Sequence, residues 1–140
     1  MVMLYKIVKA VENLVEYHGN SNCIEYNNNS NIISLYDYIE RIDKYTYCRC
    51  DETLICALVL LDRLPSITKY TMHINFYLAY FFADIYLSDY KIDINRCFDI
   101  SGITKKEFKY CSRVFLNSIK YNISISQEEY ENKKIMLSRI

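Results

Sequence analysis

Glycine and proline are scarce in this sequence, whose 140 residues include two glycines and one proline. Folds rich in β-hairpins need many tight turns, and these two residues supply the backbone conformations that such turns require. Their scarcity argues against a β-rich fold and favours an all-α fold. Hydrophobic residues make up 51% of the chain and aromatic residues 15%, which is enough for one domain with a buried core.

The chain also lacks a surplus of either charge, because it has seventeen basic and seventeen acidic residues. Nucleic-acid-binding proteins usually carry a basic surplus that neutralises phosphates, so we expect no nucleic-acid partner. The apolar run at residues 76–83, which no other run in the chain exceeds, ends at Asp84 and is far shorter than the roughly 20 apolar residues that span a bilayer. Lysines and glutamates interrupt residues 1–18, unlike a signal peptide. We therefore expect a cytoplasmic or nuclear protein, or both, with no membrane contact.

Apolar residues recur with helical spacing along most of the chain and predict a single all-helical domain over residues 1–140. Residues 54–61 (LICALVLL) are apolar on every side, which is typical of a buried central helix. Ser34 and Thr104 are good N-cap residues, and Ser126 with Glu129 forms a capping box. The expected helices cover residues 3–18, 35–46, 52–64, 71–87, a short stretch capped by Asp93, 105–119 and 127–139.

The six cysteines could indicate a metal site or reduced thiols; they are Cys23, Cys48, Cys50, Cys56, Cys97 and Cys111. A zinc site would use Cys48 and Cys50, joined by Cys23 with His18. However, the paired Cys-x-x-Cys spacing of zinc modules is absent, so we expect reduced thiols and no metal or other cofactor. His73 has no nucleophile or carboxylate at a useful spacing, so we expect a structural histidine and no catalytic residues.

Five segments occur in order along the chain: residues 33–45 (ISLYDYIERIDKY), 57–64 (ALVLLDRL), 83–89 (ADIYLSD), 101–107 (SGITKKE) and 126–131 (SQEEYE). Together they resemble the P/U-type cyclins, the phosphate-pathway cyclin family of fungi and protists. In that family a helix with the pattern Ile-x-x-Tyr-Leu-x-Arg-Ile-x-Lys-Tyr precedes a helix that ends in Asp-Arg-Leu. The resemblance implies a cyclin box at about residues 33–125, a five-helix bundle around a buried central helix. Helices at 3–18 and 127–139 would flank the box.

The resemblance further implies a non-catalytic regulatory subunit that forms a heterodimer with a cyclin-dependent protein kinase. In cyclins the box docks on the small lobe of the kinase and pushes a movable helix inward, which completes the Lys–Glu ion pair needed for phosphoryl transfer. The kinase-contacting residues expected here are Ile85, Tyr86, Tyr90, Glu107, Phe108 and Ser112. Tyr80 is a further interface candidate, because tyrosine tolerates partial exposure.

Two of these positions depart from the family. Ile85 stands where the family has a lysine that reaches the kinase, and Ser112 stands where it has a glutamate. Binding can survive such a loss, since interfaces draw most of their energy from buried apolar anchors. An alternative therefore stays open: a cyclin-fold interaction module that binds a non-kinase protein, or an inactive kinase without activating it.

A structural salt bridge is expected between Arg41 and Asp62. A carboxylate near the C-terminus of a buried helix meets the negative end of the helix dipole and needs a cationic partner. Arg41 stands at the arginine of the family motif and could supply one, which would tie the first box helix to the second. The other reading is that Arg41 pairs only with Asp37, one turn back on its own helix.

Overall fold

The computed structural model describes residues 2–18, 33–45, 51–88 and 94–140, and this part of the chain contains seven α-helices and no strand. The prediction of an all-α fold is therefore confirmed for the described residues. The helices are α1 (Val2–His18), α2 (Leu35–Tyr45), α3 (Asp51–Asp62), α4 (Met72–Leu87), α5 (Ile94–Ser101), α6 (Lys105–Ser118) and α7 (Gln127–Ser138).

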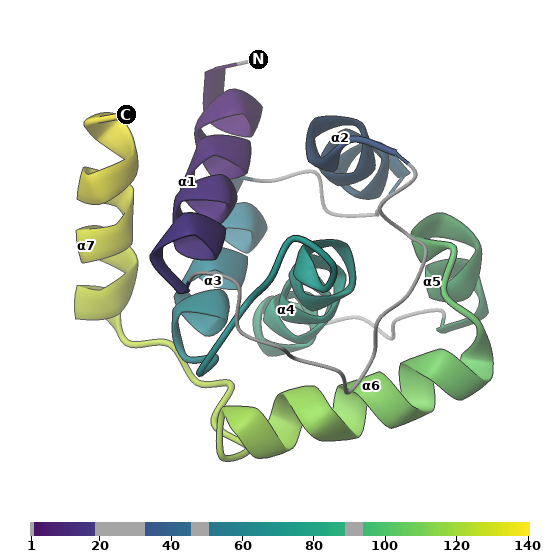
Figure 1. Cartoon of the computed structure of the whole chain (residues 1–140). Helices are drawn as coiled ribbons and strands as arrows, with labels where there is room; N and C mark the ends of the chain where they lie inside the picture. The colour runs from purple at the N-terminus through teal and green to yellow at the C-terminus, as the bar shows by residue number, and fades with distance from the viewer. Residues whose placement is uncertain (1, 19–32, 46–50, 89–93) are drawn as a thin grey trace.

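Two helices, α3 and α4, occupy the centre of the fold. Every residue from 53 to 61 in α3 and from 73 to 84 in α4 is buried. Helix α3 is apolar on every side from residue 54 to 61, which explains its burial, whereas the buried stretch of α4 also includes His73, Asn75 and Asp84. Helix α4 packs against α1, α2, α3 and α6, while α3 packs against α1, α4 and α7. In Figure 1, α4 is seen nearly end-on with α2, α3, α5 and α6 around it. The sequence predicted one central helix, and the structure has two.

The predicted starts of α2, α6 and α7 are confirmed, and α1, α3 and α4 begin within one residue of their predicted starts. Asp93, the expected cap of the short helix, lies outside the described residues. The Ser34 hydroxyl accepts a hydrogen bond from the backbone N–H of Asp37 at 3.0 Å, at the start of α2. Ser126 and Glu129 form the expected capping box, with reciprocal bonds of 3.1 Å between each side chain and the other residue's backbone N–H. Thr104 caps α6 in the same way. These caps satisfy backbone donors that have no partner within the helix.

A small polar cluster ties α2 to α4 and to the end of α5. The Tyr38 hydroxyl donates a buried hydrogen bond to the carbonyl of Ser101 at 2.9 Å, and the Tyr38 ring meets the His73 ring edge-on at 5.1 Å. Nε2 of His73 lies 2.9 Å from the carbonyl of Ile33, so this nitrogen must carry the proton. Burial lowers the pKa of His73 and keeps the ring neutral. His73 is fully buried, as expected of a structural histidine.

The cysteine predictions are tested only in part. Cys56 and Cys111 are buried thiols, and no disulfide joins the described cysteines. Cys23, Cys48 and Cys50 lie outside the described residues, as does the side chain of His18. No group of three metal-binding side chains occurs among the residues that the structure describes. None of these helices is long and apolar enough to cross a membrane.

Candidate functional site

The last turn of α4 is apolar and exposed, in contrast to the rest of that helix. Ile85 is 41% exposed, Tyr86 43% and Leu87 36%, whereas every residue from 73 to 84 is buried. No neighbouring helix covers this turn as completely as the turns before it. We call Ile85, Tyr86 and Leu87 the α4 apolar turn. It contains two of the residues that the resemblance assigned to the kinase interface.

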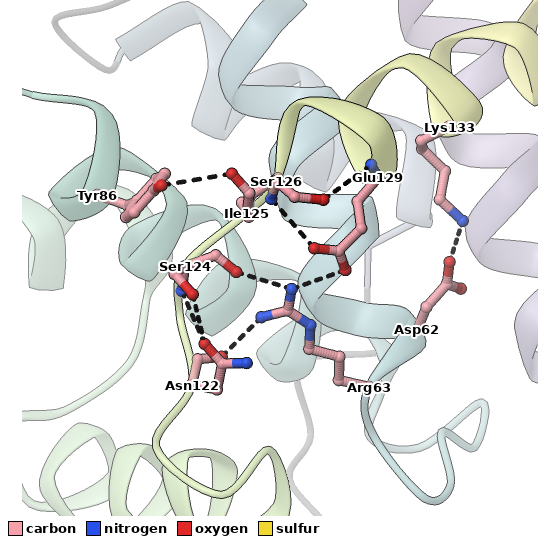
Figure 2. Close-up of polar contacts among 9 residues, drawn as sticks. All are labelled: Asp62, Arg63, Tyr86, Asn122, Ser124, Ile125, Ser126, Glu129 and Lys133. Carbon is pink, nitrogen blue, oxygen red and sulfur yellow. Dashed lines mark hydrogen bonds and ion pairs between the residues drawn. The ribbon is translucent and has the colours of Figure 1, made fainter.

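The α4 apolar turn borders a shallow groove against the start of α7. The Tyr86 hydroxyl donates a hydrogen bond to the carbonyl of Ile125 at 3.3 Å, as Figure 2 shows. The groove has a volume of about 150 Å³ and is lined in part by Tyr86, Leu87, Ile125 and Tyr130. Because its hydroxyl is already bonded within the chain, Tyr86 offers mainly its ring to a partner. An aromatic ring held in this way is suited to protein binding.

Arg63 holds the segment that carries Ile125 (Figure 2). Its Nη1 donates to the carbonyl of Asn122 at 2.8 Å, and its Nη2 donates to the carbonyl of Ser124 at 2.7 Å and to Oε2 of Glu129 at 2.8 Å. We call these contacts the Arg63 clamp. The planar guanidinium suits this task because its donors are rigidly arranged. The clamp therefore joins the end of α3 to the connection between α6 and α7.

The Arg63 clamp also affects the charge of Glu129. The hydrogen bond from Arg63 and the capping bond from the Ser126 backbone both favour the carboxylate, so they lower the pKa of Glu129. Since 44% of the Glu129 side chain is exposed, solvent screens this ion pair and its contribution to stability is small. Nothing in the sequence spacing assigned a role to Arg63, although it directly follows Asp62 in the Asp-Arg-Leu motif.

The expected pair between Arg41 and Asp62 is not formed, and this prediction was wrong. Asp62 pairs instead with Lys133 of α7, as Figure 2 shows. The Arg41 guanidinium lies over the Tyr38 ring at 5.2 Å, and none of the ion pairs among the described residues includes Arg41. Its Nη2 also lies beside Gly102, whose φ of +69° favours glycine. The carboxylate at the end of α3 does have a cationic partner, but α7 supplies it.

Phe108 is a core residue, which corrects its assignment to the interface. It is 8% exposed, and its ring packs edge-on against Phe81 at 5.0 Å and Phe98 at 5.3 Å. Tyr80 is likewise buried, with 2% of its surface exposed, so it is not an interface residue either. Both lie on faces that other helices cover, and apolar periodicity alone cannot distinguish a covered face from one that is left open. Tyr90 lies outside the described residues.

The remaining two predicted contact residues make local bonds on α6. The Glu107 side chain accepts a hydrogen bond from the backbone N–H of Thr104 at 3.2 Å and completes the capping box. The Ser112 hydroxyl donates to the carbonyl of Lys109 at 3.3 Å, one turn back on the helix. Both side chains are half-buried, and each makes one hydrogen bond to its own helix or cap. Glu107 and Ser112 therefore offer a partner less exposed side-chain surface than the α4 apolar turn does.

Comparison with known proteins assigns no family: no family model matches the sequence, and no curated protein matches it.

Proposed function

We propose that this chain is a non-catalytic regulatory subunit that binds a cyclin-dependent protein kinase through the α4 apolar turn. The observation that carries the proposal is the exposure of Ile85, Tyr86 and Leu87 at the end of a helix that is otherwise buried. A single exposed apolar side chain needs no explanation, but three consecutive large ones, about 100° apart around the helix axis, leave the end of α4 apolar on most sides. Such an apolar helix end favours a binding surface. Such side chains supply most of the energy of protein interfaces when a partner covers them.

In this proposal all catalytic groups belong to the kinase. The chain contributes a rigid surface, because α4 is anchored in the core and the Arg63 clamp fixes the segment against which Tyr86 rests. Docking of this surface on the small lobe would hold the movable kinase helix in the position that completes its Lys–Glu ion pair. Activation then depends on shape and apolar contact more than on charge.

A second candidate function is an interaction module that binds a non-kinase protein, or a kinase that it does not activate. The observation that favours it is the chemistry of Ile85 and Ser112. Ile85 carries no charge, and the Ser112 hydroxyl is bonded to its own helix. A kinase that requires ion pairs at these two positions would bind weakly or without being activated.

The first experiment is a tagged pull-down from the native cells, followed by mass spectrometry and a kinase assay on the eluate. The identified partner is then produced as a recombinant protein and titrated with the chain and with two matched variants. Tyr86→Ala removes a ring that is 43% exposed at the end of α4, and Tyr70→Ala removes one that is 52% exposed just before its start. We expect Tyr86→Ala to weaken binding at least tenfold, on the order of 1.4 kcal/mol, and Tyr70→Ala to have little effect.

The outcomes separate the two functions. A co-purifying cyclin-dependent kinase with activity supports the activator. A kinase without activity, or a non-kinase partner that is sensitive to Tyr86→Ala, supports the interaction module. Equal losses in the Tyr86 and Tyr70 variants would refute the assignment of the α4 apolar turn as the binding surface.

A further inference from the structure

A second apolar groove lies between α1, α3 and α7. Its volume is about 830 Å³, which is within the range of about 300–1,000 Å³ that is common for binding pockets. Buried Ala10 and Leu58 contribute to its lining. The large apolar side chains that line it include Leu14, Ile135, Met136 and Ile140. It shares no residue with the α4 apolar turn, so an inference about it stands apart from the proposed function.

Helix α7 leaves most of its apolar surface uncovered along this groove. Only Leu137 of α7 is buried, whereas Ile135 is 49% exposed and Met136 38%. The groove-lining residues contributed by α7 and the two residues after it run from Asn132 to Ile140, which is roughly 12 Å along a helix at about 1.5 Å per residue. That length matches about two turns of a second helix. An amphipathic helix that places its apolar face between two helices is a common mode of recognition.

The charges at the groove indicate which helix would fit. Asp62 and Lys133 both line it but neutralise each other as an ion pair. Arg139 also lines it, and the described residues form no ion pair with Arg139. Lys6 lies one turn before Ala10 on the same face of α1. Figure 1 shows the start of α1 and the end of α7 at the same end of the molecule. Arg139 is therefore the cation of the groove lining that has no ion-pair partner among the described residues, and Lys6 lies outside the lining.

We propose that this groove binds an amphipathic helix of a partner protein, with large apolar side chains on one face and carboxylates at one end. The apolar side chains would cover Leu14, Ile135 and Met136. The carboxylates would lie near Arg139, where opposite charge fixes the direction of the helix in the groove. Such a surface would let the chain hold a second protein while the α4 apolar turn is occupied.

The test uses the full chain and two designed peptides. Both are fluorescein-labelled, stapled 16-residue helices with leucines along one face; one has glutamates in its first turn and the other has lysines there. We expect fluorescence anisotropy to show saturable binding of the glutamate peptide at about 1–50 μM, and binding of the lysine peptide at least fivefold weaker. Met136→Glu in the chain should weaken binding of the glutamate peptide at least tenfold. Arg139→Glu should abolish or reverse the preference between the peptides.

The controls check that the variants are folded, that binding is specific to this groove, and that a second copy of the chain does not occupy it. Met136 is partly exposed, so Met136→Glu should remain folded, which circular dichroism and thermal unfolding will verify. Ile85→Asp, on the other surface, should leave peptide binding unchanged. The proposal is overturned if binding of the glutamate peptide is not saturable or if the Met136→Glu variant binds this peptide as tightly as the parent does. It is also overturned if the two peptides bind the parent with equal affinity. A dimer of the chain alone that Met136→Glu disperses, seen by sedimentation velocity, would show that a second copy fills the groove and would also overturn it.

Discussion

Replacement of Arg63 by alanine tests whether one side chain holds α7 and its connection against α3. The change removes two hydrogen bonds to backbone carbonyls, of 2.8 Å to Asn122 and 2.7 Å to Ser124, and the ion pair with Glu129. Each backbone bond contributes about 1 kcal/mol once partial exposure is allowed for, and the exposed ion pair about 0.5 kcal/mol. We therefore expect Arg63→Ala to lower the free energy of unfolding by roughly 2–3 kcal/mol.

The assay is urea unfolding followed by circular dichroism at pH 7. With a urea dependence of about 2 kcal/mol per molar, the midpoint should fall by about 1 M. Arg63→Lys keeps the charge but not the planar fork, so it should recover only part of the loss. Glu129→Gln removes only the charge of the ion pair and should cost about 0.5 kcal/mol.

The pH dependence provides an independent check. Because the folded-state pKa of Glu129 is lowered, its ion pair stabilises the fold fully above the unfolded-state pKa of about 4.3 and is lost as pH falls below that value. The difference between the parent and Arg63→Ala should therefore shrink slightly in acid. A loss for Glu129→Gln as large as that for Arg63→Ala, or a loss for Arg63→Ala below about 0.5 kcal/mol, would refute the assignment of the two carbonyl bonds as the main contribution.

Three further predictions follow from burial. Phe108→Ala should lower the free energy of unfolding by about 3–4 kcal/mol, because it leaves a cavity in the core. Ile85 is exposed, so Ile85→Ala should change the free energy of unfolding by less than about 1 kcal/mol. Equal changes for the two variants in urea unfolding would contradict this distinction. Tyr38→Phe should cost about 1–2 kcal/mol by removing the bond to Ser101. Burial raises the pKa of Tyr38, so its neutral form stabilises the fold below a pH of about 10, and this contribution is lost as the pH rises above that value. In thermal unfolding, Tyr38→Phe should therefore lose less stability at alkaline pH than the parent does. Burial raises the pKa of Cys111 to about 11, so mass-spectrometric mapping should find it unalkylated at pH 8 in the native protein and alkylated in urea.

The fold class and the helix starts could be predicted because they depend on neighbours in the chain. The capping box of Ser126 and Glu129 joins residues three positions apart, and Ser34 bonds to Asp37 at the same spacing. The apolar run at 54–61 correctly indicated a buried helix. The centrality of α4 was harder to predict, because several of its buried residues are tyrosine, asparagine or histidine, which also occur on surfaces.

The candidate site could be predicted only in part. Ile85 and Phe108 are both apolar residues near helix ends, yet one is exposed and the other lies against Phe81 and Phe98. Periodicity identifies an apolar face but does not reveal which neighbouring helix covers it. The kinase-binding role of the exposed residues remains a proposal that the pull-down and the Tyr86 variant will test.

The sequence by itself determined that this chain forms helices, where several of them begin, and that the carboxylate of Asp62 needs a cation. The tertiary structure decided which cation it is. Lys133 is 71 residues away from Asp62, and it reaches the carboxylate only because α7 docks on α3. The same docking brings Arg63 to Asn122 and Ser124 and leaves a groove beside α1. Local hydrogen bonds follow from short spacings along the chain, whereas these contacts depend on how helices that are distant in sequence pack together.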